Sequence, residues 1–178
     1  MTLPNATLVL GGAASGKSAF AEKLVKTTGK EQIYIASAQV WDPEMHDKID
    51  RHKVSRGAGW TTIEAPLAVD EILAKRTSDQ VVLFDCATLW LTNHVMKESD
   101  LEAKVHGLLD AVAACPAPMV IVSNELGHGI VPDNAMARAF RDQHGRMNQR
   151  IAEACDLVVM VTAGLPQVLK GTLPEAAQ

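Results

Sequence analysis

The sequence has little of what marks secreted, membrane-spanning or nucleic-acid-binding proteins. Its three cysteines are far apart and lie in apolar runs, which predicts buried thiols rather than disulfides or a metal site. No apolar run approaches the ~20 residues that a membrane-spanning helix needs, and the N-terminus lacks the charged-then-apolar pattern of a signal peptide. The net charge of -4 gives no cationic footprint for nucleic acid. We therefore expect a cytoplasmic protein that neither spans a membrane nor binds nucleic acid.

What the sequence does contain fits a single domain over residues 1–178, without repeats or linkers. Hydrophobic residues make up 47% and charged residues 21%, and the length allows one sizeable core. Short apolar runs alternate with helical patterns, which predicts an α/β fold with a mainly parallel central sheet flanked by helices. The expected strands are residues 7–10, 33–36, 81–84, 119–122 and 157–161. The expected helices are residues 17–28, 43–56, 67–76, 101–114 and 135–154.

Residues 11–18 match the pattern G-x-x-x-x-G-K-[ST] of a phosphate-binding loop, or P-loop. An apolar run precedes the match and helical spacing follows it, which is the strand–turn–helix context that the loop requires. Lys17 would reach the β- and γ-phosphates, and Ser18 would bind Mg²⁺. A glycine turn with a capping serine is the alternative. We predict a P-loop NTPase-like fold whose nucleotide site includes Gly11, Gly12, Ala13, Ala14, Ser15, Gly16, Lys17 and Ser18.

Polar residues follow three further expected strands. Asp85 ends the apolar run 81–84, which is the Walker B pattern in which an aspartate holds Mg²⁺ directly or through water. Ser37 and Ser123 each follow another run. Because ligands in open α/β sheets bind beyond the carboxyl ends of the strands, we expect these residues to face the nucleotide. For Ser37, a plain exit from strand to loop is the alternative.

The segment 42–56 predicts a helix with Lys48, His52 and Arg56 four residues apart on one face. Stacked cations repel one another, and an anionic partner such as a triphosphate would relieve that repulsion. His52 could then be a general base, a nucleophile or a ligand of the anion. A solvated charged face with an incidental histidine is the alternative, and spacing alone favours it.

Two more sets of charged residues are candidates for binding. Glu64 lies in a short extended segment, and its carboxylate could accept two hydrogen bonds from the N1–H and N2–H₂ edge of guanine. An exposed surface glutamate is the commoner explanation. The helix expected at 135–154 carries arginines that could meet an anionic substrate or a neighbouring subunit, or form a solvated face: Arg138, Arg141 and Arg146.

These blocks together resemble one family, the bifunctional adenosylcobinamide kinase / adenosylcobinamide-phosphate guanylyltransferase family of cobalamin biosynthesis. The resemblance covers nearly the whole chain, and the blocks around His52 and from Ser123 to Gln149 are its most specific parts. It implies that the aminopropanol hydroxyl of adenosylcobinamide is phosphorylated with ATP or GTP. It also implies a second step, in which GMP passes from GTP to that phosphate and gives adenosylcobinamide-GDP and pyrophosphate.

The same resemblance implies roles for individual residues. His52 would be a catalytic residue that carries GMP covalently. Lys17, which the P-loop pattern places at the β- and γ-phosphates, would be the second catalytic residue, and the P-loop and Walker B patterns assign Mg²⁺ binding to Ser18 and Asp85. Contacts with GTP carry over to Ala36, Ser37, Ala38, Lys53, Val54, Ser55, Arg56, Glu64 and Asp85. ATP and GTP are the implied nucleotide substrates, and a homotrimer is the implied assembly.

Some questions stay open at the level of sequence. Ala14 and Lys48 stand where the family usually has Arg, and Lys48 keeps the charge but loses the bidentate fork of a guanidinium. No residue is identified that would deprotonate the substrate hydroxyl in the kinase step. One alternative function is a small-molecule kinase without GMP transfer. Another is a nucleotide-dependent switch, against which stands the lack of an N/T-K-x-D guanine motif.

Overall fold

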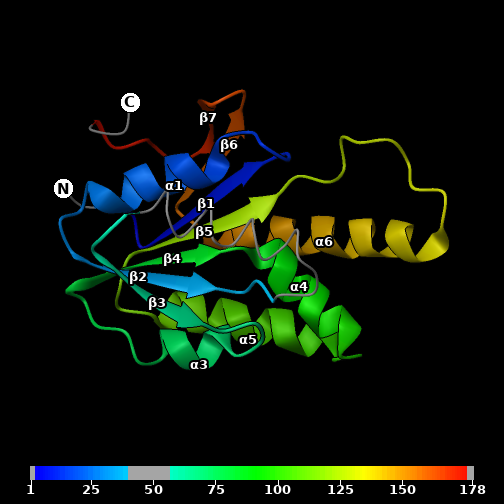
Figure 1. Ribbon diagram of the computed structural model, residues 1–178, viewed down its shortest axis with the longest axis horizontal. Helices are drawn as coiled ribbons and strands as arrows, with labels where there is room; N and C mark the ends of the chain where they lie inside the picture. The colour runs from blue at the N-terminus through cyan, green and yellow to red at the C-terminus, as the bar shows by residue number, and fades with distance from the viewer. Residues whose placement is uncertain (1–2, 40–56, 176–178) are drawn as a thin grey trace.

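The computed structural model describes residues 3–39 and 57–175, which form a seven-stranded sheet flanked by helices (Figure 1). The strand order is β3-β2-β4-β5-β1-β6-β7, and all paired strands are parallel except β6 and β7. The strands are β1 (Ala6–Gly11), β2 (Glu31–Ala36), β3 (Trp60–Glu64), β4 (Gln80–Asp85), β5 (Met119–Asn124), β6 (Leu157–Thr162) and β7 (Leu165–Lys170). The described helices are α1 (Lys17–Lys26), α3 (Val69–Leu73), α4 (Ala87–Met96), α5 (Leu101–Ala114) and α6 (Ala135–Ala154).

The two faces of the sheet build separate cores, because successive side chains of a strand point to opposite sides. On one face, Val9 of β1 shares a buried cluster with Phe20 and Leu24 of α1. On the other face, Leu8 shares a buried cluster with residues of α3, α4, α5 and α6, among them Ile151. The central strands are thus covered on both faces, which explains why they are continuous apolar runs rather than alternating ones.

The predicted α/β fold is confirmed. All five expected strands are present and slightly longer than expected, and α5 and α6 begin and end at the expected residues. The helix expected at 67–76 is shorter: α3 ends at Leu73, after which the N–H groups of Lys75 and Arg76 donate to carbonyls only three residues back. The expected helix at 43–56 lies outside the described residues.

The sequence does not predict β7, the antiparallel edge strand. All six of its residues are exposed, so its sequence carries no pattern of burial. A two-residue turn joins it to β6, and both turn residues have positive φ, 52° at Ala163 and 78° at Gly164. Such a turn matches the twist of a β-hairpin. Pro166 is tolerated in β7 because an edge strand leaves one row of N–H groups unpaired.

The carboxyl ends of four parallel strands meet at one edge of the sheet. Ala36 is in register with Asp85, Asp85 with Val122, and Gly11 with Asn124. This edge is where the segments singled out from the sequence come together. None of the helices in residues 3–39 and 57–175 is long and apolar enough to cross a bilayer.

Candidate active site

The phosphate loop connects β1 to α1 at this edge. Gly16 has a φ of 92°, and a Cβ there would lie 3.1 Å from the Cα of Gly164 in the β6–β7 turn. At Gly11 a Cβ would come within 2.3 Å of Ser15 Oγ and 2.7 Å of the Val161 carbonyl oxygen. Side chains are therefore excluded at both glycines. The Gly164 N–H also donates to the Ser15 carbonyl at 2.8 Å, so the unpredicted hairpin supports the loop.

Ala14 is the loop residue with an unusual backbone. Its φ is 53°, a left-handed conformation that L-residues adopt at a cost of roughly 1–2 kcal/mol. Its side chain is exposed, so the strain is not offset by packing. Ala14 therefore has a strained main chain and no cationic side chain, at the position where the family that the sequence resembles usually has Arg.

Lys17 lies at the start of α1, and its Nζ donates to the Gly12 carbonyl at 3.0 Å. Its charge also reaches the end of β4, where it opposes the two effects that raise the pKa of the Cys86 thiol to about 12. Those effects are burial, which is the larger, and the negative charge of Asp85. The lysine of the loop and the aspartate of the Walker B strand thus act on one and the same neighbouring group.

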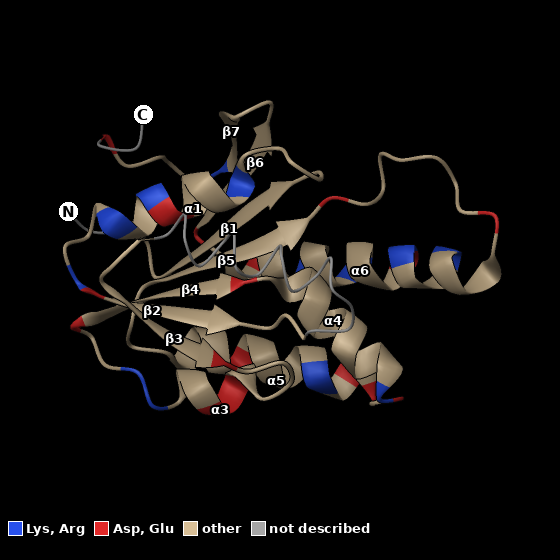
Figure 2. Ribbon diagram, in the orientation of Figure 1, with Lys and Arg blue, Asp and Glu red and all other residues tan. Residues whose placement is uncertain are grey.

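Asp85 ends β4 and is half-buried. Its Oδ2 accepts a hydrogen bond from the Tyr34 hydroxyl at 3.0 Å, and its peptide bond to Cys86 is cis. β5 lies between β4 and the loop strand β1. Figure 2 shows acidic residues, in red, at the ends of both β4 and β5.

The donor set at this edge suits Mg²⁺. Ser18 offers a hydroxyl and Asp85 a carboxylate, and Mg²⁺ prefers oxygen ligands, which are often one or two carboxylates completed by phosphate oxygens and water. Among the described residues no group of three or more His, Cys, Asp or Glu side chains could hold a metal. The hydroxyl of Ser18 and the carboxylate of Asp85 thus fit an ion whose other ligands are phosphate oxygens and water.

Ser37, which follows β2, forms hydrogen bonds within the protein. Ser37 is fully buried; its Oγ donates to the Cys86 carbonyl at 2.7 Å and accepts from the Cys86 N–H at 2.9 Å. The Ser37 carbonyl accepts from Asn93 Nδ2 at 2.8 Å. Ser37 thus ties β2 to β4 and α4, while Ala36 and Ala38 beside it are half-buried at the shared edge. Contact between the Ser37 hydroxyl and a nucleotide stays a prediction, and it would require breaking these bonds.

The remaining predicted nucleotide contacts divide into two groups. Glu64, the last residue of β3, is exposed and in register with Ala36, so it stands at the same edge, farthest from the loop strand. His52 and the adjoining predicted contacts lie outside the described residues: Lys53, Val54, Ser55 and Arg56.

A buried hydrogen-bond network fixes the end of β5. Thr88 Oγ1 accepts from the Asn124 N–H at 2.9 Å and lies 2.9 Å from His144 Nε2. Asn148 Nδ2 donates to the Asn124 carbonyl at 3.0 Å, and Asn148 Oδ1 accepts from the Ser123 hydroxyl at 2.7 Å. The Asn124 main chain is thus held on one side by α4 and on the other by α6. We call the five residues of this paragraph the β5 clamp.

The buried network favours the neutral form of His144. Burial lowers its pKa, and the negative charge of Glu125 only partly opposes that effect. His144 Nε2 lies within hydrogen-bond distance of two hydroxyls, Thr88 Oγ1 at 2.9 Å and Ser123 Oγ at 3.3 Å. The sequence analysis gave His144 no role. The signal that could have found it is the four-residue spacing of His144 and Asn148 on the buried face of α6, next to Met147 and Ile151.

The three predicted arginines of α6 differ in their contacts within the protein. Arg138 Nη1 donates to the carbonyls of Pro132 and Asp133 at 2.9 Å, so it braces the loop before α6. Arg141 lies 3.9 Å from the carboxylate of Asp142. Arg146 is exposed. An anionic substrate or a neighbouring subunit at these arginines stays a prediction.

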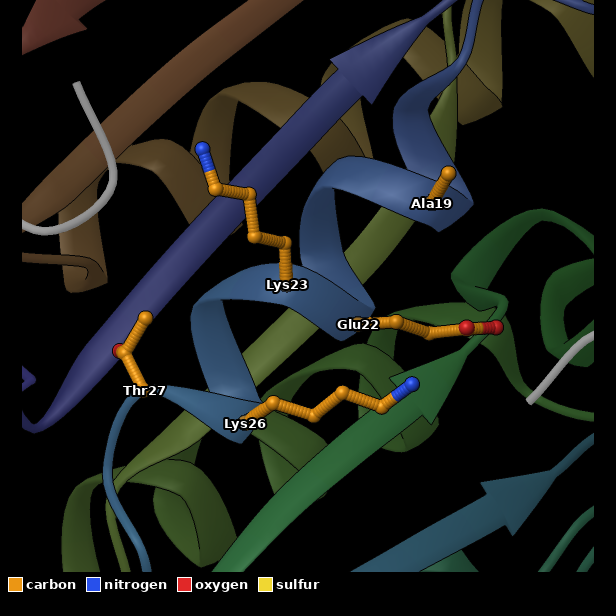
Figure 3. Close-up of a pocket in the computed structure, with 5 residues that line it drawn as sticks. All are labelled: Ala19, Glu22, Lys23, Lys26 and Thr27. Atoms are coloured by element: carbon orange, nitrogen blue, oxygen red, sulfur yellow. The ribbon is translucent and has the colours of Figure 1, made fainter. Parts of the chain in front are cut away.

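A separate hollow of about 400 Å³ lies along the flank of α1 (Figure 3). It is lined by Ala19, Glu22, Lys23, Lys26 and Thr27. These residues belong to the body and the end of the helix, whereas the phosphate loop precedes its first residue. The hollow is therefore not part of the site formed at the strand ends.

Comparisons with known proteins agree with this architecture. The family described as "Cobinamide kinase / cobinamide phosphate guanyltransferase" matches residues 7–169. The bifunctional adenosylcobalamin biosynthesis protein CobP of Pseudomonas aeruginosa is 41% identical over 92% of this chain and 96% of its own length. The bifunctional adenosylcobalamin biosynthesis protein CobU of Escherichia coli is 37% identical over 92% of this chain and 98% of its own length.

Solved structures support the fold. An ATPase from a type III secretion system of pathogenic bacteria has a TM-score of 0.56 at 10% identity, covering 98% of this chain and 60% of its own. A protein from Pyrococcus horikoshii OT3 has a TM-score of 0.54 at 8% identity, covering 98% and 91%. Likeness at such identity concerns the fold alone, and it agrees with the P-loop NTPase-like architecture. Through the match over residues 7–169 and the identities with CobP and CobU, the chain belongs to the cobinamide kinase / cobinamide phosphate guanyltransferase family.

Proposed function

We propose that this protein phosphorylates the aminopropanol hydroxyl of adenosylcobinamide and then transfers GMP from GTP to the new phosphate. The products of the second step are adenosylcobinamide-GDP and pyrophosphate. The observation that carries the proposal is a phosphate loop and a Walker B aspartate at one sheet edge, in a chain that belongs to a family named for both reactions. ATP or GTP serves the first step and GTP the second.

In the kinase step the loop holds the nucleotide by its backbone. The N–H groups at the start of α1 and the helix dipole favour the phosphate oxygens, and Lys17 exchanges its bond to the Gly12 carbonyl for a bond to a phosphate. Ser18 and Asp85 hold Mg²⁺, which supplies neutralisation of the phosphate charge. Tyr34 keeps the Asp85 carboxylate oriented through its hydroxyl.

In the transfer step the imidazole of His52 attacks the α-phosphorus of GTP and pyrophosphate leaves. The resulting GMP–histidine bond is then broken by a phosphate oxygen of adenosylcobinamide phosphate. Lys48 and Arg56 stabilise the charge that develops on the phosphates. Glu64 binds the guanine edge, with Ala36 and Ala38 lining the same side. We further propose a homotrimer in the cytoplasm as the working form.

GTP labelled at the α-phosphate, mixed with the protein and Mg²⁺, tests the transfer step. We expect a protein label that resists alkali and is lost in acid, as a phosphoramidate requires. His52→Ala should abolish the label, whereas His46→Ala, a change of the other histidine in the same stretch of sequence, should keep it. Nucleotide binding with no label in the wild-type protein would contradict the GMP–histidine intermediate. Phosphorylation of adenosylcobinamide, followed with γ-labelled ATP, tests the kinase step separately.

A further inference from the structure

The kinase step requires a proton acceptor. The substrate hydroxyl oxygen forms a bond to the γ-phosphorus, the bond from that phosphorus to the β–γ bridging oxygen breaks, and the nucleoside diphosphate leaves with the electron pair. The hydroxyl proton must pass to a base within hydrogen-bond reach. Such a base has to stand at the edge that carries the phosphate loop.

Three described carboxylates stand at the ends of strands at this edge: Glu64 ends β3, Asp85 ends β4, and Glu125 directly follows β5. The strand order gives their relative distances from the loop strand β1. With about 4.8 Å between neighbouring strands, the end of β3 lies roughly 19 Å from β1, and the end of β4 roughly 10 Å. Glu125 follows the strand next to β1, and its N–H donates to the Gly11 carbonyl at 3.0 Å. It is thus bonded to the first residue of the phosphate loop.

The carboxylate of Glu125 is held in a defined orientation. Its Oε1 accepts from the Gly127 N–H, and a Cβ at Gly127 would lie 2.8 Å from that oxygen, so a side chain there would displace the carboxylate. Among the described residues no partner occupies Oε2, which leaves one oxygen for a substrate hydroxyl. The residue is half-buried rather than fully exposed, which limits its freedom further.

The β5 clamp explains why this position is fixed. It binds both the N–H and the carbonyl of Asn124, the residue before Glu125, and uses buried side chains from α4 and α6 to do so. Asp85, by contrast, is engaged by Tyr34 and suited to Mg²⁺. Of the two carboxylates nearest the loop, Asp85 is therefore suited to binding Mg²⁺, whereas Glu125 is available for another role.

We propose that Glu125 is the catalytic residue that accepts the proton of the aminopropanol hydroxyl in the kinase step. This inference rests on the proposed function. The proton moves to Oε2 as the oxygen–phosphorus bond forms, and it returns to water after the nucleoside diphosphate departs. GMP transfer does not need Glu125, because in that step a phosphate oxygen attacks and no hydroxyl loses a proton.

Glu125→Gln is the discriminating variant, because its amide oxygen still accepts from Gly127 N–H while the side chain no longer takes up a proton. We expect kcat of the kinase reaction to fall about 100-fold or more, within the range usual for loss of a general base. KM for both substrates, and GMP transfer to adenosylcobinamide phosphate supplied directly, should stay within about threefold. Asp133→Asn, a change of an exposed acid in the same loop, is the matched control and should leave both activities unchanged.

Other results would overturn the proposal. Kinase activity within tenfold of wild type in Glu125→Gln would exclude Glu125 as the acceptor, and equal loss of both reactions would show that it supports the nucleotide site instead. If Glu125→Gln does not fold, Glu125→Ala with added formate takes its place: formate should restore the kinase rate, and no restoration would count against the proposal. A wild-type protein without kinase activity would contradict the proposed function itself, which keeps the two failures distinct.

Discussion

The phosphate loop and the end of β5 face the same site but are held in place by opposite means. The loop at 11–18 is shaped by its own glycines and by main-chain contact with the Gly164 turn. The end of β5 is shaped by side chains that are far apart in sequence, from Thr88 to Asn148. A short pattern therefore encodes the loop, whereas the clamp exists only once the fold has brought α4, β5 and α6 together.

The difference predicts different consequences of mutation. In the loop, the kinase chemistry depends on the Lys17 side chain. The stability of the loop depends on the absence of side chains at Gly11 and Gly16. In the β5 clamp, every residue except Asn124 contributes through a buried polar side chain, and each lost partner leaves another group unsatisfied. Variants of the two regions can therefore be compared by measuring both kinase activity and the free energy of unfolding.

Lys17→Ala should give the largest effect and should separate activity from stability. Kinase activity is expected to fall by about 10²–10³, as is typical when a donor to developing phosphate charge is removed. Because Lys17 is only half-buried, the free energy of unfolding should change by less than about 0.5 kcal/mol. Steady-state kinetics and urea denaturation on the same preparation check this. Unchanged kinase activity would remove Lys17 from the mechanism.

Gly11→Ala tests whether the loop depends on the absence of a side chain. The added methyl would overlap Ser15 Oγ and the Val161 carbonyl, and such overpacking typically costs about 1–3 kcal/mol. Gly12→Ala is the matched control, because a Cβ there meets nothing within 4 Å and its unfolding free energy should be nearly unchanged. Equal urea midpoints for the two variants would contradict the described loop geometry.

Asn148→Ala tests the β5 clamp. It removes the hydrogen bonds of Asn148 to the Asn124 carbonyl and to the Ser123 hydroxyl, which keeps only its longer contacts with Thr88 and His144, and this should lower the free energy of unfolding by about 2 kcal/mol. Kinase activity should fall as well, because Glu125 follows the released peptide. Gln149→Ala, a change of the exposed neighbour, should leave both quantities unchanged. A stable Asn148→Ala protein would show that the clamp contributes little.

The smallest expected effect is a pH dependence of stability that comes from His144. Burial lowers its pKa in the folded state, so below the usual value of about 6.5 the unfolded chain binds the proton more readily. Stability from the neutral ring is therefore present above pH ~6.5 and is lost as the pH falls toward the folded-state pKa. His94, whose pKa burial also lowers, contributes with the same sign. As the pH falls from 8 to 5, the urea midpoint should decline less steeply in His144→Gln than in wild type.

What could be predicted from the sequence follows the same division. The loop, the buried strands and the long helices α5 and α6 were predictable because neighbours in sequence determine them. The role of His144 was not predictable, since it comes from contacts with Thr88 and Ser123, which are 56 and 21 residues away in the sequence. Nor was the structural use of the Ser37 hydroxyl, which depends on a peptide 49 residues away. β7 gave no signal because its strand is exposed throughout and is defined by pairing with β6 alone.

The central position of β1 has a consequence for synthesis of the chain. Strand β1 leaves the ribosome first, yet its two neighbours are β5 and β6, with Thr7 in register with both Val120 and Leu157. Val9 on one face can pack early against Phe20 and Leu24 of α1, but the two hydrogen-bonding edges of β1 must wait for strands whose partner residues lie 113 and 150 positions later (120 − 7 and 157 − 7). Contacts of such long sequence separation slow folding. During translation the phosphate loop thus lacks its neighbouring strands and the supporting Gly164 turn until β5, β6 and that turn have been made, so competence to bind nucleotide should arise late within residues 6–170.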